Sequence, residues 1–337
     1  SLLPGPIAVN VSTYVGYRLR GHAGALVAAV AAILPAFVLI VLLSAAYFRW
    51  GQLPVVNKLF MGFIPAVTAV IVAAAWSMSR KSLSGLREAG IAIAACAALL
   101  GIGGFYSTLL IIVGAGVIGW LLFRKEPGAP SRPGNKLAES KPGFNVNAML
   151  VCTAPFSGVP WWSFDPALIT KLFAVFAGIS VMLFGGGYVF IPLIQEIVVS
   201  EHQWVTSQEF IDGIALGQIT PGPILVSAAF IGLKVAGLAG AVVATVAIFA
   251  PPAMLMVAAS GAFERLQHSS ALQAALHGVR PAVIGMIFAA AVVVGRTSVP
   301  AWYSVAIFAV ALYALARFRV EAVWIIPAAG LAGMLIY

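Results

Sequence analysis

Charged side chains are scarce in this chain of 337 residues, where Asp, Glu, Lys and Arg together make up 9%. A soluble globular domain carries about 25% of them. Hydrophobic residues account for 62%, and the mean hydropathy is +1.04. A chain of this composition cannot cover its surface with water-facing side chains, so we expect an integral membrane protein.

Cysteine, histidine and aspartate are also rare, which excludes several kinds of chemistry. The two cysteines, Cys96 and Cys152, lie far apart, and the four histidines are scattered without zinc-ligand spacing. We therefore expect neither a disulfide framework nor a metal site, and no cofactor. The two aspartates are Asp165, placed to cap a helix, and Asp212. No catalytic constellation is visible, so the chain is not expected to be an enzyme.

The 19 Lys and Arg residues outnumber the 10 Asp and Glu residues, so the formal net charge is +9. The basic residues lie in short gaps between apolar runs rather than on one amphipathic face, which argues against a nucleic-acid partner. An excess of Lys and Arg in such gaps is typical of cytoplasmic loops in a membrane protein. The lipid bilayer is thus the expected surroundings, and the bacterial cytoplasmic membrane the expected location.

The apolar runs predict an all-α, multi-pass membrane protein, since a spanning helix needs roughly 20 apolar residues. The expected spans are 23–48, 59–78, 89–103, 105–123, 166–187, 238–262, 276–295, 301–316 and 320–337. Residues 124–160 are rich in Pro, Gly and charge over most of their length and are interpreted as a linker. The expected domains are a first repeat over 1–123 and a second repeat over 161–337.

Two helices of the second half are too short to span a membrane. Thr206 and Glu209 form a T-x-x-E capping box that opens a helix over about 207–219. The segment Pro221–Pro223 breaks it, and a second short helix runs to about residue 235. Two half-length helices around a Pro/Gly break are typical of a re-entrant or discontinuous membrane helix.

The chain resembles itself at an offset of 216 residues. The matched positions are Gly16/Gly232, Gly21/Gly237, Gly24/Gly240, Pro35/Pro251, Gly62/Gly278 and Pro65/Pro281. With one residue of slippage, Pro4-Gly5-Pro6 matches Pro221-Gly222-Pro223. Proline sites kept in register over this length predict two structurally equivalent halves. The first half has no counterpart of 165–217, so we expect a sequence truncated at its start.

Each half is expected to cross the membrane an odd number of times, which would make the two repeats inverted. With the linker in the cytoplasm, fourteen Lys and Arg residues fall on the cytoplasmic side and four outside, with Arg280 inside a span. This asymmetry agrees with inversion. This count of basic residues supports inversion only if the short helix pair enters and leaves the membrane on one face.

The ordered motifs of both halves resemble the chromate transporter family over nearly the whole chain. Those motifs are Phe184–Tyr188, Trp204, Glu209-Phe210, Asp212-Gly213, Gln218 and Thr220–Pro223 in the second half, and Leu3–Pro6, Asn10, Tyr14–Gly21 and Gly24-Ala25 in the first. The resemblance implies secondary active transport of chromate, as efflux that confers resistance. Alternatives are transport of sulfate or another oxyanion, or an inactive truncated membrane protein. The resemblance leaves a second copy of the chain, as a homodimer, open as a partner.

Helix N-termini can bind such an anion, because their free N–H groups and the helix dipole favour negative charge. We therefore expect a substrate site between the two Pro-Gly-Pro segments. Its predicted members are Pro4, Gly5, Pro6, Asn10, Gly185, Gly186, Gly187, Gln218, Thr220, Pro221, Gly222, Pro223, Ile224 and Arg280. Asp212 is the candidate for proton coupling, or else for polar support of the break.

Each of these residues has a structural alternative. The Pro-Gly-Pro segments could merely turn the chain, and the glycines at 185–187 could end a helix and allow tight packing. Arg280 could extend to the membrane surface from its helix. Gln218 and Asn10 could make hydrogen bonds within their own helix pairs.

Overall fold

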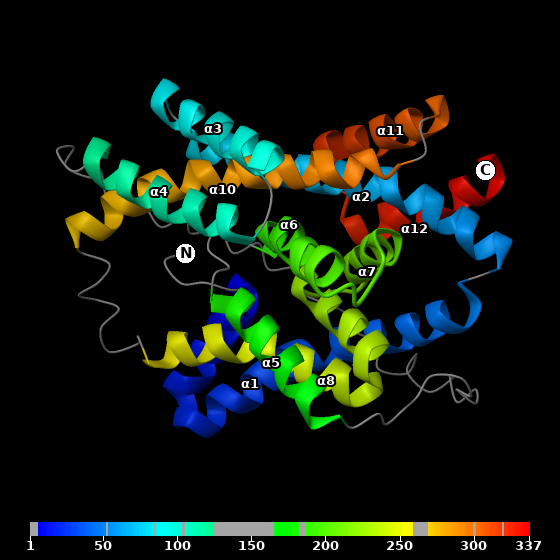
Figure 1. Cartoon of the computed structure of the whole chain (residues 1–337), viewed down its shortest axis with the longest axis horizontal. Coiled ribbons are helices and arrows are strands. Elements are labelled where there is room, and N and C mark those ends of the chain that lie inside the picture. Colours follow the sequence, from blue (N-terminus) through cyan, green and yellow to red (C-terminus); the bar gives the residue numbers. More distant parts are fainter. Residues whose placement is uncertain are drawn as a thin grey trace.

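The computed structural model describes residues 6–51, 53–83, 85–102, 105–123, 165–181, 187–258, 269–298, 301–318 and 320–337, and within them the regular structure is helical throughout. This confirms the all-α prediction (Figure 1). The α-helices are α1 (Ile7–Trp50), α2 (Pro54–Ser82), α3 (Leu86–Ile102), α4 (Phe105–Phe123), α5 (Pro166–Val181), α6 (Phe190–Gln195), α7 (Ser207–Ile219), α8 (Ser227–Ala258), α10 (Ser270–Arg296), α11 (Trp302–Phe318) and α12 (Ala322–Ile336). Short helical turns are η2 (Gly187–Val189), η3 (Glu196–Glu201, a π-helix) and η4 (Ile224–Val226). The expected linker 124–160 lies outside the described residues.

Four of the described helices, α1, α2, α8 and α10, are long and apolar enough to cross a membrane. The other apolar helices are shorter, and residues 182–186 of the expected span 166–187 lie outside the described residues. The start of α5 is as predicted: Pro166 is the first helical residue, and Asp165 Oδ1 accepts from the Ala167 N–H at 3.0 Å. The multi-pass class is thus confirmed.

Helices α1 and α8 each consist of two arms joined by a sharp bend. In α1 the bend lies at Arg20 (φ −140°, ψ 27°) and Gly21 (φ 61°, ψ −147°). In α8 it lies at Ala236 (φ −143°, ψ 30°) and Gly237 (φ 63°, ψ −153°). The second residue of each pair has a backbone conformation that essentially only glycine adopts. The same bend therefore recurs at the 216-residue offset found in the sequence.

The two arms meet closely next to each bend. Gly16 packs against the backbone of Gly24, and Gly232 packs in the same way against Gly240. Along one straight helix, residues eight positions apart would be separated by about 12 Å. Small residues allow this close approach of two helical backbones. The glycines that match in the sequence thus have the same packing role in both halves.

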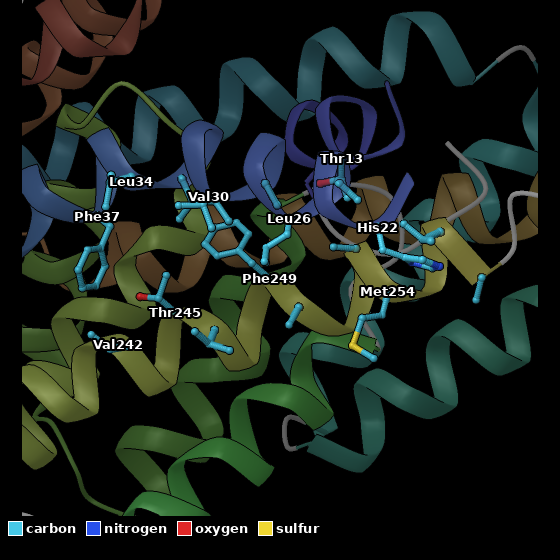
Figure 2. Close-up of a pocket in the computed structure, with 18 residues that line it drawn as sticks. Thr13, His22, Leu26, Val30, Leu34, Phe37, Val242, Thr245, Phe249 and Met254 are labelled. Carbon is cyan, nitrogen blue, oxygen red and sulfur yellow. The ribbon is translucent and has the colours of Figure 1, made fainter. Parts of the chain in front are cut away.

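The long second arms of α1 and α8 lie side by side and run in opposite directions. Figure 2 shows His22 next to Met254 at one end of the pair and Phe37 near Val242 at the other. Between them lies a cavity of about 760 Å³ with an almost wholly apolar lining. Its threonines are already paired: for example, Thr13 Oγ1 donates to the Val9 carbonyl at 2.8 Å. This cavity therefore suits a hydrocarbon chain rather than an anion.

The halves are intertwined instead of forming separate bodies. Helix α2 of the first half packs on α12 of the second, and α10 of the second packs on α4 of the first. Gly62 of α2 lies against Ala329 and Gly333, while its sequence match Gly278 of α10 lies against Ala115 and Gly119. Corresponding helices thus make corresponding contacts across the two halves.

Candidate anion-binding site

The break between α7 and α8 is the centre of the candidate site. The capping box predicted for α7 is present: Glu209 N donates to Thr206 Oγ1 at 3.2 Å, and Thr206 N donates to Glu209 Oε2 at 2.8 Å. Helix α7 ends at Ile219 with Thr220 as its C-cap, and Pro221, Gly222 and Pro223 lead into η4 and α8. The sequence thus breaks the helix where the prolines predict it.

Gly222 lies against the middle of α1. A Cβ added to Gly222 would be 2.6 Å from the Cβ of Ala36. The long arm of α1 runs from residue 22 to residue 50, so Ala36 is its midpoint. If that arm spans a bilayer, the break lies at mid-depth and away from both surfaces.

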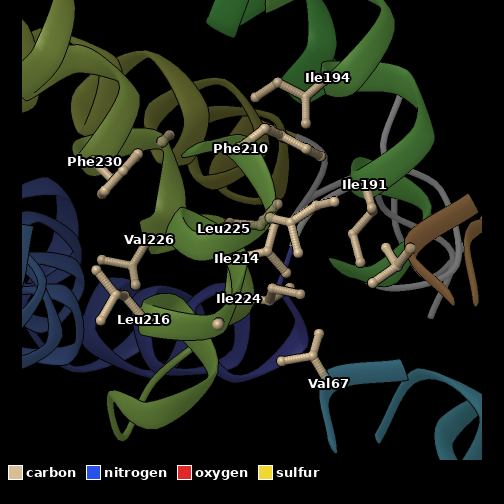
Figure 3. Close-up of a cluster of buried hydrophobic side chains, with 14 of the residues drawn as sticks. Val67, Ile191, Ile194, Phe210, Ile214, Leu216, Ile224, Leu225, Val226 and Phe230 are labelled. Carbon is tan, nitrogen blue, oxygen red and sulfur yellow. The ribbon is translucent and has the colours of Figure 1, made fainter. Parts of the chain in front are cut away.

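The sides of the break are held by a buried hydrophobic cluster, whereas its tip is open. Figure 3 shows Ile224, Leu225 and Val226 surrounded by apolar side chains of α6 and α7, with Val67 of α2 facing Ile224. Pro221 and Gly222 at the tip are exposed. A rigid, buried base with an open tip can present backbone N–H groups to a ligand without reorganising.

Candidate hydrogen-bond donors lie on both sides of the break, at the end of α7 and the start of α8. The first N–H groups of a helix have no partner within it. Here Val226 N donates to the Pro223 carbonyl at 3.0 Å and Ser227 N to the Ile224 carbonyl, so the candidate donors are the N–H groups of Ile224 and Leu225. Gln218 Nε2 and Ser227 Oγ are buried without a hydrogen-bond partner among the described residues, and the Tyr188 side chain is a polar neighbour of Gln218. Thr220 is also buried, but its hydroxyl donates to the Gly217 carbonyl at 2.8 Å. Thr220 thus supports the end of α7 instead of offering a free donor.

The glycine-rich segment before α6 reaches this site. A Cβ on Gly187 would be 2.6 Å from Ile224 Cγ2, so only glycine fits against the start of α8 without displacement. Gly185 and Gly186 lie outside the described residues. The part of the segment that the structure describes therefore packs against the helix start.

The first half shows part of the same arrangement. Pro6 is the N-cap residue of α1, while Pro4 and Gly5 lie outside the described residues. Asn10 is buried, and its backbone N–H donates to the Pro6 carbonyl at 3.0 Å. Asn10 follows Pro6 by four positions, as Ser227 follows Pro223. Counting from the second proline of each segment would have identified Ser227 as a candidate from the sequence.

Asp212 lies on α7, about 9 Å along the helix from Gln218. It is 3% exposed, and both carboxylate oxygens accept hydrogen bonds. Tyr47 Oη donates to Oδ2 at 2.7 Å, and Gln208 Nε2 donates to Oδ1 at 3.0 Å. Burial of a carboxylate is costly unless it is paired in this way. Nothing in the local sequence around Tyr47 indicates this contact.

Three charged residues lie outside this polar group. Glu209 pairs with Lys234 across α7 and α8, with side chains 23% and 31% exposed. Arg280, which the sequence places among the substrate ligands, is exposed on α10. The structure thus brings Gly187, Gln218, Gly222 and Ile224 together and leaves Arg280 on the surface of its helix.

Known proteins resemble this chain along most of its length. The sequence profile described as "Chromate transporter" matches residues 1–120 and 170–334. The "Chromate transport protein" of Cupriavidus metallidurans is 29% identical over 337 residues, which are 100% of this chain and 81% of that protein. The "Probable chromate transport protein" of Synechococcus elongatus is 30% identical over 295 residues, 88% of this chain and 72% of that protein.

A shorter relative corresponds to part of the chain. The "Uncharacterized transporter YwrA" of Bacillus subtilis is 28% identical over 169 residues, which are 49% of this chain and 95% of that protein. No solved structure matches the chain. The profile match covers well over half of the residues, and the chain therefore belongs to the chromate transporter family.

Proposed function

We propose that this chain carries out secondary active transport of chromate out of the bacterial cell, as a protein of the cytoplasmic membrane. The substrate binds at the break between α7 and α8, with the Pro4–Pro6 segment of the first half opposite. The single observation that supports this site most strongly is the contact of Gly222 with Ala36 at the midpoint of α1. A break at that depth offers helix N-termini where no water would otherwise solvate an anion.

The charge balance supports an anionic cargo and suggests the source of energy. A helix N-terminus carries roughly half a positive charge, so two of them offset about half of a dianion. Buried donors such as Gln218 add hydrogen bonds without adding charge. The occupied site would therefore keep net negative charge, and a membrane potential acts on that charge.

The inside-negative potential of a bacterium favours outward movement of a dianion. One elementary charge gains about 2.3 kcal/mol per 100 mV. At 100 mV the chromate dianion therefore gains about 4.6 kcal/mol, or roughly a two-thousandfold concentration ratio. Efflux is thus the direction that the potential drives. Asp212 would couple proton movement to this cycle, because its carboxylate is buried on the same helix about 1.7 turns from Gln218.

Inverted repeats would supply the conformational change. The long arms of α1 and α8 run in opposite directions, and corresponding helices make corresponding contacts (Figure 2). If the two halves swap conformations, the break would open first to one side of the membrane and then to the other.

Chromate flux in proteoliposomes tests the proposal. With purified protein and a potassium diffusion potential of set sign, chromate should move toward the positive side, and reversing the potential should reverse the flux. In inverted membrane vesicles, uptake should stop when ionophores collapse the gradients. Flux that ignores both the potential and the pH gradient, or no flux at all, would contradict active chromate transport.

Sulfate is the second candidate cargo, because it has the same shape and charge and the described residues of the site contain no feature that separates the two. Competition by sulfate for chromate flux distinguishes a general oxyanion site from a chromate-specific one.

A further inference from the structure

A partly buried hydrogen bond joins the two halves of the molecule near the candidate site. Tyr47 belongs to the end of α1 in the first half, and Asp212 belongs to α7 in the second, 165 positions later. The Tyr47 hydroxyl donates to Asp212 Oδ2 at 2.7 Å, while Gln208 donates to Oδ1. Both carboxylate oxygens are therefore occupied as acceptors.

Aromatic rings pack around the Tyr47 side chain. The Tyr47 ring lies 5.0 Å from the ring of Phe60 and 5.4 Å from those of Phe48 and Phe230. Phe230 comes from the first arm of α8, and Phe60 from α2. The ring of Tyr47 is thus fixed by residues of both halves, and its hydroxyl has little freedom to turn.

The charged groups around Asp212 are few. On α7 the neighbour is Glu209, which pairs with Lys234 of α8. On α1 Arg49 follows Tyr47 by two positions, and on α2 Lys58 precedes Phe60 by two. Helices α6 and α12, which also contact α7, contain no titratable side chain within their bounds. A proton that reaches Asp212 therefore changes the charge of a group held mainly by hydrogen bonds.

We propose that Tyr47 is a positioning residue whose bond to Asp212 latches α7 to the first half, and that protonation of Asp212 releases the latch. Each oxygen keeps a second lone pair that can take a proton. Protonation removes the negative charge to which Tyr47 and Gln208 donate. A hydrogen bond to an ionised acceptor is roughly twice as strong as a neutral one. Protonation therefore weakens the attachment of α7, the helix that ends at the break.

This inference rests on the proposed function, because it supplies the step that links a proton to the break. Helix α7 leads directly into Pro221, so a shift of α7 moves the tip relative to Ala36. Tyr47 itself does not belong to the break. Its removal should therefore change the pH at which the site responds rather than the affinity of the site for the anion.

The test replaces Tyr47 by phenylalanine in the full chain, reconstituted in proteoliposomes. Loss of a donor to the ionised carboxylate should favour the protonated form, and the midpoint of the pH–flux profile should move by about one to two pH units to higher pH. Chromate binding at alkaline pH should stay within about twofold of the native value. Tyr313→Phe, on an exposed face of α11, is the matched control and should leave the profile unchanged.

A second measurement does not depend on transport. Hydrogen–deuterium exchange of residues 207–219 should be faster in native protein at low pH than at high pH, after correction for intrinsic rates. Tyr47→Phe should reach the fast rate at a pH about one to two units higher than native protein does, and Asp212→Asn should show no pH dependence. Equal exchange of native protein and Tyr47→Phe at every pH would overturn the latch, even if chromate flux is never observed.

If Tyr47→Phe does not fold, the milder variant Gln208→Leu, at an exposed position, replaces it in the test. It should move both readouts in the same direction by less than one pH unit, because a neutral amide donor is lost. No shift in this variant would contradict the latch. Native protein whose exchange depends on pH as expected but which carries no chromate would contradict the proposed function alone.

Discussion

Gly222→Ala is the substitution that most sharply tests how the break packs. Gly222 is not among the described residues with positive φ, so alanine can adopt its backbone conformation. The new Cβ, however, would lie 2.6 Å from Ala36 Cβ. Carbon atoms prefer about 3.5 to 4.0 Å, so the tip must move away from α1 by roughly 1 Å.

The expected loss follows from the cost of overpacking. Inserting a methyl group into a packed contact costs about 1 to 3 kcal/mol, and every 1.36 kcal/mol corresponds to a factor of ten. Chromate flux by Gly222→Ala should therefore fall by roughly 5- to 160-fold, provided that transport needs the tip docked on α1. The assay is flux into proteoliposomes at equal protein content.

Ala36→Gly provides the compensating change. In the double variant, Ala36→Gly removes the methyl group that Gly222→Ala would strike, so flux should return to within a few-fold of native. Ala36→Gly alone should cost about 1 kcal/mol of stability through helix propensity and leave the contact intact. Gly178→Ala, where a Cβ would meet nothing within 4 Å, is the control. Native flux in Gly222→Ala, or no recovery in the double variant, would refute this packing.

Two further predictions concern stability, measured as thermal unfolding in detergent. Gly237→Ala should lose about 1 to 3 kcal/mol because φ 63° and ψ −153° are accessible essentially only to glycine, whereas Gly178→Ala should lose nothing. A Gly237→Ala variant of native stability would mean that the bend in α8 is not required. Lys234→Met should change stability by less than about 1 kcal/mol, since its ion pair with Glu209 is partly exposed. A much larger loss would show that this pair is buried by lipid.

The sequence predicted the features that depend on neighbouring residues. The cap at Asp165, the capping box at Thr206 and Glu209, and the helix break at Pro221 all follow from interactions within a few positions. Hydrophobic run length likewise located the four long helices. The bend at Gly237 was indicated less directly, through its match to Gly21.

Contacts between the halves could not be predicted in this way. The approach of Gly222 to Ala36 and the bond from Tyr47 to Asp212 depend on how distant helices dock. The exposed position of Arg280 has the same cause, because the direction of a helical side chain has meaning only once the neighbouring helices are placed. The role of Arg280 as a ligand stays a prediction.

Locating the bound anion directly tests the central claim. Chromium scatters anomalously, so crystals grown with chromate give an anomalous difference map that marks its position. We expect the peak at the tip of the break, within hydrogen-bond distance of the amide groups between Gly222 and Leu225 and of Gln218. A peak in another part of the molecule, with the break empty at saturating chromate, would contradict the account.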